Sequence, residues 1–187
     1  YGNQRPLSAS WTVTGSGAFA LGLNQKCRAH ITGMTPGRIV DYGLKDSMNM
    51  GACMAPAAAD TVARHMEDFH VTPEEYDRII TGDLGSVGQT VLIDLLREKG
   101  IDIADRHMDC GIEIFDAEAQ DTHAGGSGCG CSAVTLAAYI LPKLESGEWK
   151  KVLFLPTGAL LSKTSFNEGK SVPGIAHAVV LESPAVK

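Results

Sequence analysis

The stretch His123-Ala-Gly-Gly-Ser-Gly-Cys-Gly-Cys-Ser-Ala133 decides the fold, because it joins a glycine-rich loop to an Ala- and Leu-rich helix over about residues 132–143. Glycines at positions 125, 126, 128 and 130 allow a tight turn that points several backbone N–H groups at one place. The following helix adds the positive end of its dipole there. The loop therefore predicts a binding site for something small and negatively charged.

Short apolar strands alternate with helices along the rest of the chain. Strands are predicted over residues 10–23, 30–41, 76–81, 151–155 and 171–182. Helices are predicted over about residues 57–69, 85–100 and 132–143, with a further helix start at Thr72-Pro-Glu-Glu75. An irregular segment over 45–58, a short strand or turn over 109–115 and a loop over 158–162 complete the pattern. Strands separated by helices predict an α/β fold with a buried central sheet.

Length and composition set the domain organisation. A chain of 187 residues that is 44% apolar and 20% charged can bury a core as one domain, residues 1–187. The opening Tyr1-Gly-Asn-Gln-Arg-Pro-Leu7 is typical of a loop within a protein. We therefore expect the chain to be a fragment of a longer one.

Charge and hydropathy argue against two functions, nucleic-acid binding and membrane spanning. The net charge is −6 and there is no basic cluster, so the chain lacks the electrostatic signature of a nucleic-acid-binding protein. The longest apolar runs, such as Val152–Leu155, are too short to span a bilayer. Any association with a membrane is expected to go through a partner protein.

The five cysteines are an odd number and show no secreted-type spacing. Cys129 and Cys131 form a CxC pair, and with His123 they still lack a fourth zinc ligand. The prediction is free cysteines in a reducing compartment and no metal site. Cys53, in Gly51-Ala-Cys-Met-Ala-Pro56, is either an activated thiol at a helix entrance or a small packed residue, and packing is the favoured interpretation.

Several motifs resemble a known family. The segment WTVTGSGAFAL at residues 11–21 resembles the strand that opens the C-terminal half of thiolase-fold condensing enzymes. More specific motifs, spread over nearly the whole chain, resemble the stage V sporulation protein AD family: Tyr1-Gly-Asn-Gln-Arg-Pro6, Met50-Gly-Ala-Cys-Met-Ala-Pro-Ala-Ala-Ala-Asp60, Thr81-Gly-Asp-Leu-Gly85, the glycine loop and Gly174-Ile-Ala-His-Ala178. The resemblance implies a thiolase-like half with layered α-β-α architecture and a mixed five-stranded sheet with helices on both faces. It also implies that residues 1–187 form the C-terminal half of a two-half protein that is a homodimer at full length.

The same resemblance implies a function in sporulation. That family is linked to the handling of dipicolinic acid in spore formation and germination. A protein of this kind would bind dipicolinic acid, or its calcium complex, for uptake into the developing spore, and would need no cofactor. Its expected partners are membrane proteins of the same spore transport complex, and its expected location is peripheral, on the inner (forespore) membrane.

Catalysis of the thiolase type is not expected, because the necessary groups are missing. Condensing enzymes use a cysteine thiolate together with His or Asn groups that stabilise an oxyanion. One of these groups falls within residues 81–85, where Asp83 would repel a developing oxyanion. Another falls within residues 125–130, where Ser127 is the polar side chain available. The alternatives left open are a condensing enzyme that uses a cysteine from outside this chain, and a scaffold that docks onto a membrane transport complex.

The candidate ligand-binding residues follow from these considerations. Gly125, Gly126, Ser127 and Gly128 would supply backbone and hydroxyl donors to the carboxylates of dipicolinate. His123 adjoins the loop, and His177 either fills the core or lines the pocket. Two further pairs are weaker candidates: Asp83 with Asp109 through calcium, and Lys163 with Lys170 through their charge.

Overall fold

A mixed five-stranded sheet forms the centre of the molecule. The structure is a computed structural model that describes residues 6–23 and 26–184. The strand order is β2 (His30–Thr35), β9 (Ala178–Glu182), β6 (Lys151–Leu155), β3 (Arg78–Thr81) and β4 (His107–Asp109). Strand β3 runs parallel to β4 and β6, whereas β9 is antiparallel to both of its neighbours, β6 and β2. The predicted α/β class and mixed five-stranded sheet are confirmed.

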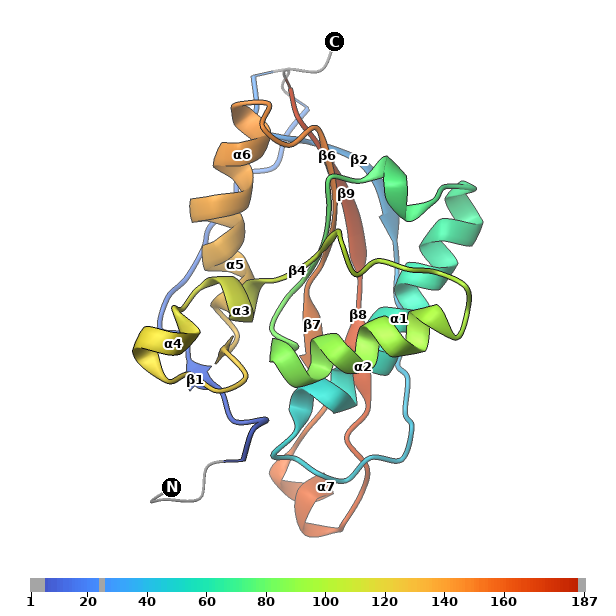
Figure 1. Cartoon of the computed structure of the whole chain (residues 1–187), viewed down its shortest axis with the longest axis vertical. Coiled ribbons are helices and arrows are strands. Elements are labelled where there is room, and N and C mark those ends of the chain that lie inside the picture. The colour runs from blue at the N-terminus through green and yellow to red at the C-terminus, as the bar shows by residue number, and fades with distance from the viewer. Residues whose placement is uncertain (1–5, 24–25, 185–187) are drawn as a thin grey trace.

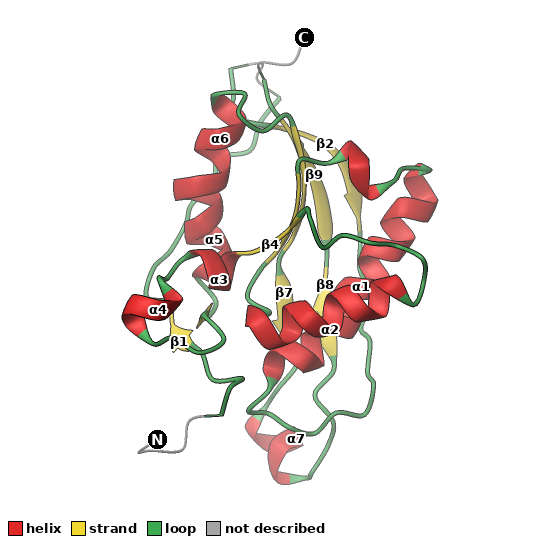
Figure 2. Cartoon of the chain, in the orientation of Figure 1, coloured by secondary structure: helices red, strands yellow, loops and turns green. Residues whose placement is uncertain are grey.

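Helices cover both faces of this sheet (Figures 1 and 2). On one face lie α1 (Met50–Phe69) and α2 (Gly85–Arg97), and on the other lies a continuous helical segment made of α5 (Cys131–Thr135), a π-helical turn η2 (Leu136–Ile140) and α6 (Leu141–Glu145). Strand β6 shows the alternation that two buried faces require: Leu153 belongs to the core under α1 and α2, while Val152 and Phe154 belong to the core under α6. The expected helices on both faces are therefore present.

Shorter elements surround the sheet at its edges and ends. Strand β1 (Trp11–Thr12) pairs in parallel with β5 (Gly126–Ser127), and β7 (Thr157–Ala159) pairs antiparallel with β8 (Gly174–Ala176). The remaining pieces are the 3-10 turn η1 (Pro73–Glu75) and the short helices α3 (Cys110–Glu113), α4 (Ala117–Gln120) and α7 (Lys163–Asn167). In Figure 1, α7 lies at one end of the long axis and β6 begins near the other.

The prediction of a strand over residues 10–23 is wrong beyond two residues. Only Trp11–Thr12 is in a strand, and the chain then runs in extended form beside the start of α5. A Cβ atom on Gly15 would lie 2.6 Å from Val134, and one on Gly17 would lie 2.8 Å from the carbonyl oxygen of Ala133. The alternating small residues thus serve contact with a helix instead of sheet pairing.

The first helix begins earlier than predicted. Helix α1 starts at Met50, so the segment expected to be irregular up to residue 58 is largely helical. Asn49 caps it by accepting a hydrogen bond from the backbone N–H of Ala52 at 3.4 Å. Pro56 lies inside the helix and removes one backbone donor, but the surrounding alanines are buried against the sheet and favour the helix.

Other boundaries also differ from the prediction. The helix-start signal at Thr72 gives only the 3-10 turn η1, and β4 ends at Asp109, after which α3 begins at Cys110. The loop expected over residues 158–162 begins inside β7. The closing strand is divided into β8 and β9 at His177, where the ring Nδ1 accepts a hydrogen bond from the N–H of Gly37 at 3.0 Å.

A candidate ligand pocket at the glycine loop

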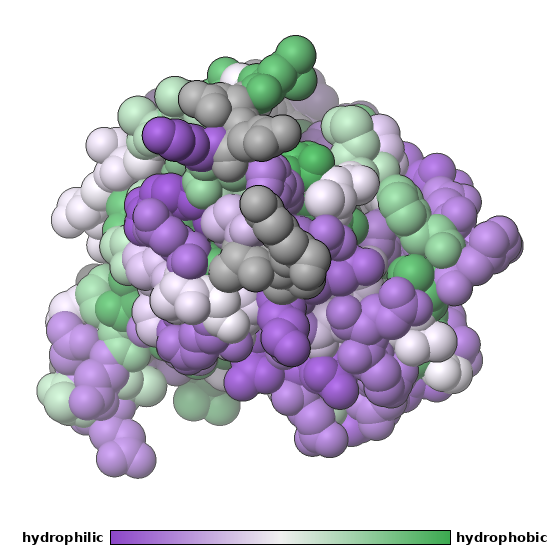
Figure 3. All heavy atoms as spheres, turned by 90° about the horizontal axis from the view of Figure 1, so that it is seen from above, coloured by the Kyte–Doolittle hydropathy of each residue, from purple (hydrophilic) through white to green (hydrophobic). Residues whose placement is uncertain are grey.

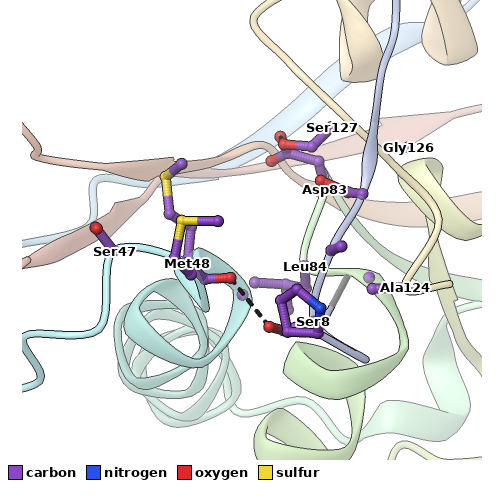
Figure 4. A pocket seen from close by; sticks show the side chains of 14 residues that line it. Ser8, Ser47, Met48, Asp83, Leu84, Ala124, Gly126 and Ser127 are labelled. Carbon is purple, nitrogen blue, oxygen red and sulfur yellow. Dashed lines mark hydrogen bonds between the residues drawn. The ribbon is translucent and has the colours of Figure 1, made fainter. Parts of the chain in front are cut away.

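A cavity of about 310 Å³ lies where the glycine loop meets the first turns of α1 and α2. Figure 4 shows Met48 and Ser47 on one side of it, and Asp83 and Ser127 on another. The lining residues are Pro6, Ser8, Ala9, Ser10, Ser47, Met48, Met50, Gly51, Asp83, Leu84, Gly85, Ala124, Gly126 and Ser127. Among these, Asp83 carries the charge and four serines carry hydroxyl groups. The pocket is therefore part apolar and part hydroxylic, with one carboxylate.

Asp83 connects the glycine loop to the sheet. Its Oδ2 accepts hydrogen bonds from the Ser127 hydroxyl at 2.8 Å and from the Gly128 N–H at 3.0 Å. Its Oδ1 accepts one from the Thr157 hydroxyl at 3.2 Å. Asp83 follows the end of β3 and Thr157 follows the end of β6, and these strands are parallel neighbours. The carboxyl ends of parallel strands meet at one edge of a sheet, and this topology places the two residues together.

The negative charge that the glycine loop holds is thus the protein's own. The N–H of Gly128 already donates to Asp83, and this contact occupies one of the donors predicted for an external anion. Much of the glycine serves packing: a Cβ on Gly130 would lie 2.1 Å from the carbonyl oxygen of Gly15. Gly125 has a φ of +116° and also lies close to the backbone of Gly111. Binding of a ligand by Gly125, Gly126, Ser127 and Gly128 stays a prediction, and of these Gly126 and Ser127 line the cavity.

Asp109 is a structural carboxylate. Its side chain is buried, with 1% of the residue exposed, and it accepts hydrogen bonds from five donors. The donors are the Thr81 hydroxyl and the backbone N–H groups of Leu84, Gly85, Gly111 and Ile112. With its lone pairs directed at these groups, Asp109 fixes the turn between β3 and α2. This arrangement does not favour the calcium role considered for Asp109.

The two candidate histidines lie outside the cavity lining. His123 has a positive φ of 54°, its Nδ1 lies 3.1 Å from the carbonyl oxygen of Pro6, and its Nε2 lies 3.4 Å from Asp121. It therefore holds the N-terminal segment that lines the cavity without lining the cavity itself. His177 is exposed and bonded to Gly37, so neither the predicted core position nor a place in this lining is observed for it.

The three buried cysteines give no sign of an activated thiol. Burial raises the pKa of the thiols of Cys53, Cys110 and Cys131, in the case of Cys131 to about 12. Cys53 lies in the first turn of α1 and is buried, which confirms that it is a packed residue. Cys129 is exposed in the loop. Across residues 6–23 and 26–184, no group of three or more His, Cys, Asp or Glu side chains is placed to hold a metal ion.

The sequence motifs do not predict one wall of the pocket. Ser8 and Met48 close the cavity on one side, and the Ser8 hydroxyl donates to the carbonyl oxygen of Met48 at 3.0 Å. These residues are 40 positions apart in sequence, and no local pattern connects them. The methionines around the start of α1, Met48 and Met50, were the available signal, because flexible thioether side chains are common at adaptable binding surfaces.

The fold and the pocket together define an α/β protein whose glycine loop closes onto an internal carboxylate beside a small mixed-polarity cavity. Residues 1–182 match the protein family described as "Stage V sporulation protein AD (SpoVAD)". The chain belongs to that family. It is 43% identical over 182 residues to the stage V sporulation protein AD of Bacillus subtilis (strain 168). That alignment covers 97% of this chain and 53% of the relative, so the chain spans about half the relative's length.

Similar solved structures include two enzymes. The Bacillus anthracis acetyl-CoA acetyltransferase matches with a TM-score of 0.44 at 14% identity, over 83% of this chain and 30% of that one. The 3-oxoacyl-[acyl-carrier-protein] synthase III of Aquifex aeolicus VF5 matches with a TM-score of 0.43 at 14% identity, over 84% of this chain and 46% of that one.

Proposed function

We propose that this protein is a non-catalytic sporulation protein that binds dipicolinic acid, or its calcium complex, for uptake into the developing spore. Membership in the stage V sporulation protein AD family supports the role in sporulation. The observation that carries the binding proposal is the cavity beside the Asp83–Ser127 contact. The hydroxyls of Ser8 and Ser127 already donate within the protein, and those of Ser10 and Ser47 can donate to ligand carboxylates. The side chains of Met48, Met50 and Leu84 can contact a flat ring.

The charge of the cavity bears on the form of the ligand. Its described lining contains Asp83 and neither Lys nor Arg, so a doubly charged anion entering alone would meet a carboxylate and no cation. A bound calcium ion would neutralise the two charges of the dianion and attract the Asp83 carboxylate, and it prefers oxygen ligands in irregular geometry. The calcium complex is therefore expected to bind this cavity more tightly than the free dianion does.

The non-catalytic part of the proposal rests on the same geometry. The group in place of the expected oxyanion donor is the Asp83 carboxylate, which is hydrogen-bonded to the glycine loop and would oppose negative charge there. Burial holds three of the five thiols in the protonated form by raising their pKa. These features favour a binding protein over an acyl-transferring enzyme.

The cellular location belongs to the same proposal. We propose that the protein acts peripherally at the inner (forespore) membrane, beside membrane proteins of the spore transport complex. None of the helices within residues 6–23 and 26–184 combines the length and hydropathy needed to cross a bilayer.

Calorimetric titration of the complete natural protein tests the binding proposal. Dipicolinate is titrated with calcium and, separately, with a chelator, for the unaltered protein and for Ser127→Ala and His123→Ala. We expect saturable one-site binding that is tighter with calcium. It should be about tenfold weaker in Ser127→Ala, because this variant removes the hydroxyl that donates to Asp83 and orients that carboxylate at the cavity. His123→Ala should change the affinity less, because its side chain lies outside the cavity lining and contacts it through the carbonyl oxygen of Pro6. Absence of binding together with covalent labelling by an acyl thioester would contradict the proposal and favour the enzyme.

A further inference from the structure

One wall of the candidate cavity is formed by the segment of residues 6–10. At the C-terminal end of this wall the main chain is paired with the glycine loop, since the N–H of Ala124 donates to the carbonyl oxygen of Ala9 at 2.9 Å. At its N-terminal end, the Nδ1 of His123 lies 3.1 Å from the carbonyl oxygen of Pro6. The position of that end of the wall therefore depends in part on the side chain of His123.

Both ring nitrogens of His123 face groups that accept hydrogen bonds and cannot donate them. The carbonyl oxygen of Pro6 has no hydrogen to give, so the Nδ1 of His123 must carry one. The other nitrogen, Nε2, lies 3.4 Å from Oδ1 of the Asp121 carboxylate. A neutral ring with its hydrogen on Nδ1 would direct a lone pair at that carboxylate, whereas a protonated ring donates at both positions. The surroundings of His123 therefore match its protonated, positively charged form.

The elements around this contact carry acidic side chains and no basic ones. The wall itself has no titratable side chain, and residues 110–130 contain neither Lys nor Arg. The titratable side chains on the surrounding elements are Asp83 at the cavity, Glu113 of α3, Asp116 and Glu118 at the start of α4, Asp121 in the same turn and Cys129 in the loop. An ionised carboxylate nearby favours a positive charge on an imidazole ring. The charges of the neighbouring elements thus favour the same protonated form.

The turn that carries His123 and Asp121 has an unusual backbone. In the part of the chain that the structure describes, the non-glycine residues with a positive φ are His70, Asp121 and His123, at 54°, 50° and 54°. Thr122 is 1% exposed, and its hydroxyl has no hydrogen-bond partner among the described residues. A left-handed backbone at two such residues and an unpaired buried hydroxyl both cost free energy, so contacts around the turn must compensate for them. The contacts of the His123 ring are among those that keep the turn in this conformation.

We infer that His123 is a positioning residue whose protonated ring holds the wall of residues 6–10 against the cavity and thereby couples ligand binding to proton uptake. The inference rests on the binding function proposed above and deepens it, because it names the condition in which the wall is in place. Loss of the proton turns a lone pair of Nε2 toward Asp121 and removes the attraction that orients the ring toward Pro6. Histidine is the side chain that ordinarily changes charge between about pH 5 and 8, so the ligand should bind more tightly toward the acidic end of that range.

Calorimetric titration of the complete natural protein with dipicolinate and calcium, at about pH 6 and about pH 8, tests the inference. His123→Asn is the informative variant, because asparagine tolerates the left-handed backbone and takes up no proton. We expect the ratio of the affinities at the two pH values to be about threefold larger in the unaltered protein than in His123→Asn, the size of one exposed ion pair. Asp121→Asn should also lower this ratio, because it removes the carboxylate that selects the protonated ring.

The matched control is another histidine with the same backbone conformation. His70 ends α1, is exposed and also has a φ of 54°, but it does not line the cavity. His70→Asn should therefore keep the ratio of the unaltered protein. Hydrophilic residues cover most of the face seen in Figure 3, at the end of the molecule that lies at the top of Figure 1. A pH profile of the unaltered protein alone would include titrations elsewhere on the molecule, and the comparison between variants removes them together with the titration of the ligand.

A measurement without ligand separates this inference from the proposed ligand. Hydrogen exchange of the Ala124 N–H, which donates to Ala9, reports whether the wall is in place. After correction for the intrinsic exchange rate, this exchange should be slower at the lower pH in the unaltered protein and equal at both pH values in His123→Asn. If that difference is observed and dipicolinate binds at neither pH, the role of His123 is supported and the proposed ligand is wrong. The inference is overturned if His123→Asn keeps the full pH dependence of binding or of exchange, or if His70→Asn loses as much of it.

Discussion

At the scale of single residues, His107 is held neutral by its neighbours. The Thr81 hydroxyl donates its one hydrogen to Asp109 at 2.6 Å, so it must accept from the Nε2–H of His107 at 3.0 Å. The other ring nitrogen, Nδ1, then accepts from the Gln89 amide at 2.8 Å. This pattern assigns the Nε2–H tautomer. Burial lowers the pKa of His107 to about 4, consistent with a neutral ring.

That shift predicts a pH dependence of stability. The folded-state pKa lies below the ordinary value of 6.5, so the unfolded chain takes up a proton first as the pH falls. The stabilisation from neutral His107 is complete above about pH 6.5 and decreases toward pH 4, by up to about 1.4 kcal/mol per pH unit. Urea denaturation between about pH 7.5 and about pH 4.5 should show a smaller decrease in the free energy of unfolding for His107→Gln than for the unaltered protein. Parallel decreases in the two proteins would contradict this assignment.

Asp83 is predicted to stabilise the fold as well as to face the pocket. Replacement by Ala removes the acceptor for Ser127, Gly128 and Thr157. We expect Asp83→Ala to lower the free energy of unfolding by about 2–3 kcal/mol, as for charged hydrogen bonds in partly buried sites. Urea denaturation measures the change. Asp105→Ala is the control, since Asp105 is exposed, and an equal loss in both variants would show that the contacts of Asp83 contribute nothing specific.

At the scale of elements, two glycines allow α1 and α2 to cross closely. A Cβ on Gly51 would lie 2.1 Å from the carbonyl oxygen of Leu84, and one on Gly88 would lie 2.8 Å from the backbone of Gly51. The contact brings the N-terminal turn of each helix to the pocket. It connects close helix packing to the shape of the candidate site.

Gly51→Ala should therefore separate these helices. We expect a loss of about 1–3 kcal/mol in the free energy of unfolding, the usual cost of overpacking, because backbone atoms cannot move aside as a flexible side chain can. Gly22→Ala is a matched control: the space around Gly22 is open, and its backbone is not in the left-handed region. Thermal or urea unfolding should leave this control within about 0.5 kcal/mol of the unaltered protein. Equal stability of Gly51→Ala would show that the helices adjust without cost.

A second element-scale feature joins the edge of the sheet to α1. His65 is fully buried, and its ring nitrogens bond to the Thr35 hydroxyl at 2.8 Å and to the Tyr76 hydroxyl at 2.6 Å. Burial lowers the pKa of His65 and raises that of Tyr76 to about 12. Both groups are therefore neutral at physiological pH and satisfy one another's hydrogen bonds.

At the scale of the whole molecule, ligand binding should be visible as stabilisation. A ligand that binds only the folded state at a hundred times its Kd adds about 2.7 kcal/mol to the free energy of unfolding. We expect the Tm of the complete natural protein to rise with dipicolinate and calcium together, and to rise less with either alone. Each variant is compared with its own ligand-free Tm, so that the lower stability of Asp83→Ala does not obscure the result. An equal increase with calcium alone would assign the effect to the metal.

The α/β class, the buried strands and the family can all be recognised in the amino-acid sequence. A continuous apolar run such as Lys151–Leu155, flanked by helices in sequence, predicts a strand whose two faces are both buried under helices. The family motifs are short contiguous segments, so they can be recognised without knowledge of the fold. The same locality explains the errors: the strand prediction over residues 10–23 could not show that a helix, and not a strand, lies alongside.

The contacts of the glycine loop, and the residues that surround it, become apparent only in the folded chain. The charge facing Ser127 and Gly128 comes from Asp83, which is 44 and 45 positions away in sequence. Hydrogen bonds between residues so far apart produce no periodic pattern in the sequence. The pocket wall at Ser8 and Met48 arises in the same way, from segments 40 positions apart in sequence that the fold brings together. Sequence patterns record which residues must be buried in each element. Which elements meet depends on how all the buried faces pack at once, because that packing is a property of the whole chain.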